Sequence, residues 1–166
     1  GEEGALSAYP LAEIESADLT ALALELAVWG ARDPAALPFL TPPNPGAFAE
    51  ARTLLADLGA LDAAGAITPH GRSIAALPLH PRLAHMLLRA GPAAAPLAAL
   101  LSDRDPLPRG TSADLTLRID ALADPRRAPA DRRAALERIR TEALRLARLA
   151  PDVAALTPAQ MAALAY

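Results

Sequence analysis

Proline constrains this chain more than any other residue, because it occurs seventeen times in 166 residues and cannot continue an α-helix or a central β-strand. The segments between the prolines are rich in alanine and leucine, whereas phenylalanine, tryptophan and tyrosine together make up only 3% of the chain. Alanine and leucine favour helix, and β-branched residues are scarce. The sequence therefore predicts a mainly α fold built from short helices.

Apolar side chains recur with helical spacing along most of the chain. This spacing predicts helices at 16–30, 46–58, 82–90, 94–103, 112–124, 129–150 and 158–166, with a further short helix after Thr68-Pro69 and a turn of helix at 33–38. Thr68 is expected to cap its helix and Pro69 to occupy the first helical position. The glycine at position 30 is a plausible end for the first of these helices.

Two short segments between the second and third helices are expected to pair. Ala60–Leu61 and Ala66–Thr68 are long enough for two hairpin strands around a turn at Asp62–Gly65. Two helices followed by a hairpin outline a winged helix. We therefore expect a winged-helix subdomain with a small β-hairpin at residues 1–68, followed by a helical bundle at residues 69–166.

The two ends of the chain indicate a piece of a longer protein. The chain begins at Gly1 without a methionine or a signal-peptide pattern, and it stops at Tyr166 inside an expected helix. Residues 1–8 are expected to be disordered or an artificial addition. No apolar run approaches the roughly 18 residues that a membrane span needs, so none is expected.

Charge divides the chain in two. Residues 1–70 carry two arginines and ten acids, a net charge of −8, whereas residues 71–166 carry fourteen arginines and nine acids, a net charge of +5. Lysine is absent, so every basic side chain is a guanidinium, which suits phosphate well. This polarity indicates different neighbours for the two halves, although drift in surface charge would give the same numbers.

The helix expected at 129–150 concentrates the positive charge. Its apolar residues cluster on one face and comprise Leu136, Ile139, Ala143, Leu146 and Ala150. Its arginines occupy the broad opposite side and comprise Arg133, Arg138, Arg140, Arg145 and Arg148. Residues 126–148 contain eight arginines and three acids, a net charge of +5. This face can neutralise phosphates, or it can be an ordinary solvated face with salt bridges, and the sequence leaves both interpretations open.

The single tryptophan, Trp29, falls on the apolar face of the first expected helix together with leucines. We therefore expect it to anchor the core; a stacking platform for a nucleobase is the less favoured interpretation.

Catalytic and cofactor motifs are missing. Without lysine there can be no G-x-x-x-x-G-K-[ST] phosphate loop, and no Asp-Glu-Ala-His box is present. Without cysteine there is no thiol nucleophile or thiolate zinc site. The three histidines (His70, His80 and His85) lack the spacing of a metal site or a nucleophile elbow. We expect no catalytic residues, cofactor or metal in this chain.

Residues 54–90 carry a recognisable combination of motifs. A leucine-rich helix is followed by L-G-A-L-D, a short turn, I-T-x-x-G, L-P-L-x-P and R-L-A-x-M-L-L. In this order the motifs resemble the accessory domain that follows the two motor domains of DEAH-box helicases, and most of all its HrpB-like bacterial branch. The likeness extends over about residues 9–125 and more weakly through residue 166.

The resemblance implies a winged helix that docks on the motor domains and a ratchet-like bundle that helps to grip a single strand of RNA or DNA. It implies that the parent protein is a cytoplasmic, ATP-dependent helicase that hydrolyses nucleotide with ATP and Mg²⁺ held outside this chain. The chain itself is expected to be non-catalytic and monomeric. The alternative is a free-standing winged-helix regulator that binds duplex DNA, which the acidic first half disfavours.

Six residues are the candidate contacts to nucleic acid. Three of them, Arg109, Thr111 and Ser112, belong to the loop and the start of the helix that follows it. The others are Arg118 on that helix and Arg138 and Arg145 on the long helix. Contacts of this kind to phosphates would give affinity without sequence preference.

Overall fold

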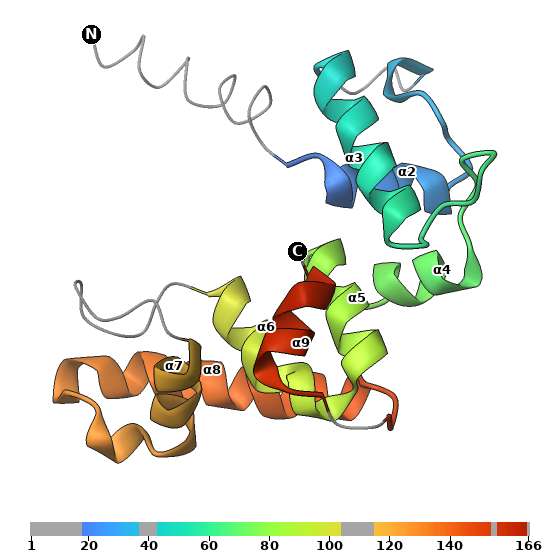
Figure 1. Ribbon diagram of the computed structural model, residues 1–166. Helices are drawn as coiled ribbons and strands as arrows, with labels where there is room; N and C mark the ends of the chain where they lie inside the picture. The colour runs from blue at the N-terminus through green and yellow to red at the C-terminus, as the bar shows by residue number, and fades with distance from the viewer. Residues whose placement is uncertain (1–17, 37–42, 104–114, 154–155, 166) are drawn as a thin grey trace, which may run out of the picture. The chain divides into compact units, whose positions relative to one another are not determined.

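The computed structural model describes residues 18–36, 43–103, 115–153 and 156–165, and these residues are mainly helical (Figure 1). The α-helices are α2 (Thr20–Val28), α3 (Pro45–Asp57), α4 (Pro69–Ala75), α5 (Pro81–Ala90), α6 (Ala95–Ser102), α7 (Leu115–Ala123), α8 (Ala130–Leu149) and α9 (Pro158–Ala165). Short 3₁₀ turns occur at η1 (Pro34–Ala36), η2 (Pro92–Ala94) and η3 (Pro125–Arg127). The predicted mainly α fold is confirmed.

Proline starts many of these elements. It is the first residue of α3, α4, α5 and α9, and of each described 3₁₀ turn. At the first helical position its missing N–H would have no partner in any case, and its fixed φ already suits a helix. The prolines therefore set where helices begin, which is why the expected boundaries agree closely with the observed ones.

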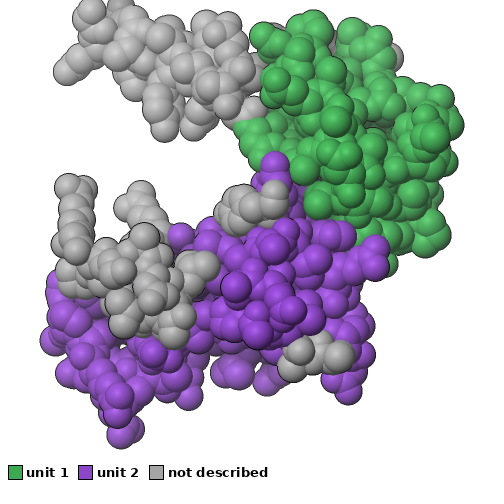
Figure 2. Space-filling model, viewed as in Figure 1, with its two compact units in different colours: residues 1–76 green, residues 77–166 purple. Residues whose placement is uncertain are grey.

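The chain forms two compact units, residues 1–76 and 77–166 (Figure 2). In unit 1, α2 packs against both α3 and α4, and the core contains Leu24, Phe48, Leu55 and Ile74. The boundary after Ala76 lies beyond the end expected for the winged-helix subdomain at residue 68, because α4 belongs with α2.

The predicted β-hairpin is wrong, since the described residues contain no strand. Only an isolated antiparallel bridge joins Leu61 and Ile67. The Asp62 carboxylate instead organises the segment between them, because its Oδ1 accepts the N–H groups of Ala64 and Ala66, both at 2.9 Å. The residues on either side of this bridge belong to the end of α3 and the cap of α4. The pairing therefore does not continue into a longer pair of strands.

The cap of α4 was predicted correctly. The Thr68 hydroxyl oxygen accepts the Gly71 N–H at 3.0 Å, and Pro69 follows at the first helical position. A side chain at Gly71 would overlap the carbonyl oxygen of Ala60. This close approach explains why glycine follows three residues after the capping threonine in the I-T-x-x-G motif.

Unit 2 is a helical bundle with an aliphatic core. Helix α8 packs along α6, while α7 contacts both helices and α5 packs against α9. The fully buried side chains of the core include Met86, Leu87, Leu97, Leu136 and Leu146. None of the described helices has the length and apolarity needed to cross a bilayer.

Candidate nucleic-acid interface

Helix α8 separates its side chains as the sequence predicted. Leu136, Ile139, Ala143 and Leu146 are buried in the core of unit 2, and Ala150, just past the helix end, is half-buried. The arginines expected on the opposite side are exposed. Asp131, near the helix start, and Arg148, in the last turn, both complement the helix dipole. The helix thus presents a row of guanidinium groups on a rigid support.

Two of the predicted contact residues already hold carboxylates. Arg138 donates two hydrogen bonds to Asp103, from Nε to Oδ2 at 3.2 Å and from NH2 to Oδ1 at 3.3 Å. Arg145 likewise donates two hydrogen bonds to Glu142, from Nε to Oε2 at 2.9 Å and from NH2 to Oε1 at 2.5 Å. Both pairs are partly exposed, so a strand could reach these arginines only in competition with their carboxylates.

The second of these pairs changes the acidity of its members. The hydrogen bond from Arg145, helped by its charge, lowers the pKa of Glu142 although partial burial acts in the opposite direction. The same hydrogen bond raises the pKa of Arg145. Both shifts stabilise the charged pair, so Glu142 remains an anion at neutral pH and neutralises the guanidinium beside it.

Arg118, a third predicted contact residue, does not extend the surface of α8. Arg118, on α7, is buried with 9% of its surface exposed, so it is held within unit 2 and not presented to a strand. Arg109, Thr111 and Ser112 lie outside the described residues.

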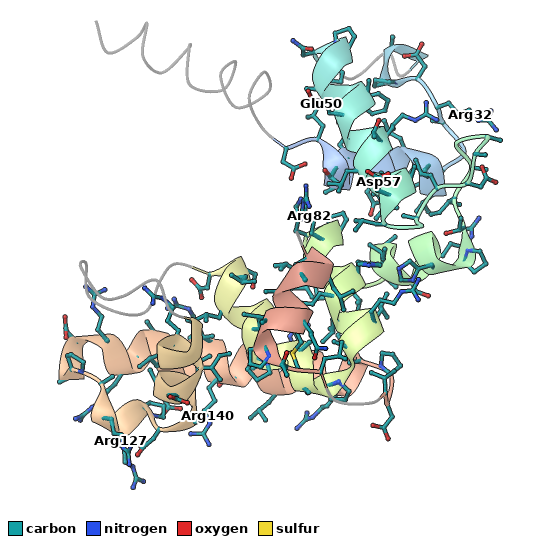
Figure 3. All side chains as sticks on the ribbon, viewed as in Figure 1. Arg32, Glu50, Asp57, Arg82, Arg127 and Arg140 are labelled. Atoms are coloured by element: carbon teal, nitrogen blue, oxygen red, sulfur yellow. The ribbon has the colours of Figure 1, made fainter. Side chains whose placement is uncertain are left out.

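Three further arginines of α8 form no ion pair among the described residues. Arg133, Arg140 and Arg148 are all exposed, and the NH2 group of Arg133 donates to a backbone carbonyl, that of Arg126, at 3.3 Å. In Figure 3, Arg140 and Arg127 both project from the lower edge of unit 2. The sequence placed these three arginines on the exposed side but gave no reason to prefer them. An acid three residues earlier predicts a local pair at both Arg140 and Arg145, and among the described residues only Arg145 forms it, so this spacing alone could not have separated them.

An apolar cavity of about 270 Å³ opens beside Arg140. Helices α6, α7 and α8 and the turn η2 line it, and it includes Ile119, Leu122, Leu144 and Ala147. Leu144 itself is 59% exposed. The lining of the cavity is almost entirely apolar, with Arg140 as the one charged residue.

Unit 1 presents a different surface. Trp29 follows the last residue of α2 and is 71% exposed, so its predicted role as a core anchor is wrong. The buried side of the helix is occupied by Thr20, Ala23, Leu24 and Leu26, and Trp29 lies past its last residue, followed by Gly30 with φ of 78°. An exposed indole of this size is typical of a contact surface.

The described residues do not bring together a metal site. No group of three or more His, Cys, Asp or Glu side chains converges among them. His80 instead caps α5, where its Nδ1 accepts the Arg82 N–H at 3.1 Å.

Comparison with known proteins agrees with the motifs. The family described as helicase associated domain (HA2), winged-helix, matches residues 51–79. A probable ATP-dependent RNA helicase of Mus musculus, DHX34, is 34% identical over 116 residues, which are 67% of this chain and 10% of that protein. The ATP-dependent RNA helicase HrpB of Escherichia coli is 38% identical over 108 residues, 62% of this chain and 13% of the relative.

A solved structure covers more of the chain than these two relatives do. The crystal structure of the E. coli DExH-box NTPase HrpB superposes with a TM-score of 0.66 and 30% sequence identity over 92% of this chain and 18% of that one. The chain therefore spans less than a fifth of each of these relatives. Sequence motifs, family match and structural likeness agree, and the chain belongs to the helicase-associated accessory domains of DEAH-box helicases, on the HrpB-like branch.

Proposed function

We propose that this chain is the non-catalytic accessory region of an ATP-dependent helicase, in which unit 1 docks on the motor domains and unit 2 helps to grip a single strand of RNA or DNA. The observation that carries the proposal is the likeness to HrpB over 92% of the chain. ATP and Mg²⁺ belong, in this proposal, to motor domains elsewhere in a cytoplasmic parent protein, and the accessory region works as a monomer.

The opposite charges of the two units support a division of labour. Residues 1–76 carry three arginines and ten acids, a net charge of −7, and residues 77–166 carry thirteen arginines and nine acids, a net charge of +4. A phosphate backbone repels the first surface and attracts the second. Nucleic-acid contact therefore falls to unit 2.

The free-standing regulator is not favoured. In a winged-helix regulator a helix of the motif enters the major groove, and the candidate here is α3. Its Glu50 and Asp57, labelled in Figure 3, are exposed. Its only arginine, Arg52, is half-buried and donates from NH1 to the Arg32 carbonyl at 3.4 Å. A helix surface with these charges repels phosphate.

The docking half of the proposal rests on Trp29. An exposed indole on an acidic unit fits an apolar pocket rimmed by basic side chains, and such anchors contribute much of the energy of an interface. The partner in this proposal is the motor region of the same polypeptide.

Fluorine NMR tests the docking directly. Trp29 is the only tryptophan, so 5-fluorotryptophan gives this chain a single resonance. Adding the unlabelled motor region of the parent protein should shift or broaden that resonance, and Trp29→Ala should weaken the association. An unchanged resonance in the presence of saturating motor region contradicts docking through Trp29.

Fluorescence anisotropy tests the grip on a strand. We expect an unstructured, labelled oligonucleotide to bind this chain weakly at low salt. With three or four phosphate contacts, the logarithm of the affinity should fall with the logarithm of salt at a slope of roughly −2 to −3. No binding at low salt contradicts the gripping role.

A further inference from the structure

The two exposed flanks of α8 are not equivalent. At 100° per residue, Arg133, Arg140 and Arg148 lie within about 80° of one another and form what we name the open flank. Arg138 and Arg145 form the paired flank, centred about 110° further round the helix. Both flanks are exposed, but only the paired flank is occupied by forked carboxylates, those of Asp103 and Glu142.

The carboxylates matter because phosphate and carboxylate compete for the same fork of guanidinium N–H groups. A phosphate that binds the Nε–NH2 fork of Arg138 or Arg145 must displace a carboxylate that already makes two hydrogen bonds. One that binds the remaining NH1 side stays next to that carboxylate, which repels it. Arg140 and Arg148 make no such bonds among the described residues, so phosphate replaces only water there. The net gain per contact is therefore larger on the open flank.

We infer that the strand held by unit 2 runs along the open flank, with phosphates on Arg133, Arg140 and Arg148, and not along the paired flank that the sequence favoured. This inference rests on the proposed gripping function and specifies its surface. The three arginines are spaced by seven and eight residues, or about 10–12 Å along the helix axis. Arg133 donates a hydrogen bond to the backbone carbonyl of Arg126, which connects this row to the basic turn η3.

The open flank is not purely positive. Glu137 lies on the same arc and is exposed. With its carboxylate, the net charge of the open flank is that of three arginines and one acid, or +2. Glu137 lies three residues before Arg140, the spacing at which Glu142 pairs with Arg145. Even so, Arg140 and Arg148 make no ion pair among the described residues, unlike Arg138 and Arg145. The sharpest test therefore changes these two arginines.

The apolar neighbours of Arg140 point to a single strand. Leu144 is exposed between Arg140 and Arg148, and the cavity of about 270 Å³ lies beside it. Unpaired bases can leave the stack and contact apolar surface, whereas duplex bases are shielded by their pairing. The open flank thus offers positive charge to phosphates and, at Leu144, an apolar surface to an unpaired base or sugar.

A matched pair of double variants tests the inference. Arg140→Gln with Arg148→Gln changes the open flank, and Arg138→Gln with Arg145→Gln changes the paired flank. Each double variant removes two exposed guanidiniums from α8 and lowers the net charge by two, so long-range electrostatics change equally. We expect the open-flank variant to weaken binding of an unstructured oligonucleotide at least about tenfold, and the paired-flank variant less than about threefold.

The salt dependence provides a second readout. Loss of two phosphate contacts should reduce the slope by roughly 1.4 for the open-flank variant and leave it nearly unchanged for the paired-flank variant. Circular dichroism melts of both variants confirm that each still folds. An equal or larger loss in the paired-flank variant overturns the inference.

The controls separate this inference from the proposed function. If the wild-type chain does not bind the oligonucleotide, the gripping function itself fails. If it binds but the open-flank variant binds equally well, only the choice of surface fails. Poly-glutamate serves as an anionic probe: competition as strong as that of an unlabelled oligonucleotide would show a general anion surface and overturn the assignment to a strand.

Discussion

Unit 1 and unit 2 are both helical, yet they use their exposed surfaces in opposite ways. Unit 1 is acidic and leaves its single tryptophan in solvent, whereas unit 2 lines its longest helix with arginine and exposes only aliphatic side chains such as Leu144 among its described large apolar residues. The exposed indole favours contact with protein and the arginines favour contact with phosphate. The difference teaches that a shared fold class says little about function, which the composition of each surface decides.

Removing a core side chain from unit 2 is the strongest way to test whether the units are separate. Leu136 is fully buried, and Leu136→Ala should lower the free energy of unfolding of unit 2 by about 2–5 kcal/mol. Because its contacts lie in the core of unit 2, hydrogen exchange should accelerate there and not in α2 or α3. Equal acceleration in both units would mean that they unfold as one.

Gly71→Ala applies the corresponding test to unit 1. The new methyl group would overlap the Ala60 carbonyl oxygen, so the turn and α4 must move apart. We expect a cost of about 1–3 kcal/mol in a denaturant melt that follows unit 1. Ser73→Ala, an exposed position on the same helix, is the control and should change little. If Gly71→Ala leaves the free energy of unfolding unchanged, the backbone at Gly71 and Ala60 can move apart without cost.

Replacing Glu142 sharpens the comparison of the two flanks of α8. Glu142→Gln releases Arg145, so the affinity for an oligonucleotide should rise by about twofold to threefold. Ala134→Gln, an exposed position on the same helix, controls for a change in polarity. Unchanged affinity would mean that the carboxylate does not limit contact at Arg145.

Glu142→Gln should also change how the stability of the chain depends on pH. The folded state lowers the pKa of Glu142, so this group stabilises the fold above its ordinary unfolded pKa, and the contribution is lost as the pH falls through the lower, folded value. The wild-type advantage over Glu142→Gln in thermal melts should therefore be present at pH 7 and disappear in acid. The advantage should be small because the pair is partly exposed.

Trp29→Ala should have the smallest effect on this chain by itself. The indole is mostly exposed, so its removal should change the free energy of unfolding by less than about 0.5 kcal/mol. Leu55→Ala, in the buried core of the same unit, is the contrasting variant and should cost several times more. A large loss of stability from Trp29→Ala would contradict its assignment to a contact surface.

The sequence by itself determined the helices. Prolines and caps act on the backbone within a few residues. Pro45, Thr68 and Pro81 therefore fix where their helices start, and these starts can be read from the sequence. The buried face of α8 followed in the same way, because a period of 3.6 residues sorts side chains before any partner is known. The family resemblance rested on the same local signals, since its motifs are caps, turns and corners.

Only the tertiary structure decided which side chains are available. The partner of Arg138 is Asp103, thirty-five residues earlier, and no local spacing predicts it. Burial of Arg118 and exposure of Trp29 depend on which neighbouring helices cover each face. The hairpin shrank to a single bridge for a related reason: Asp62 N–H and Thr68 N–H do bond across to Ala66 and Ala60, but the Ala66 N–H goes to the Asp62 carboxylate and the Ala60 N–H to the end of α3. Competition between partners distant in sequence is a property of the folded chain, so only the fold could settle it.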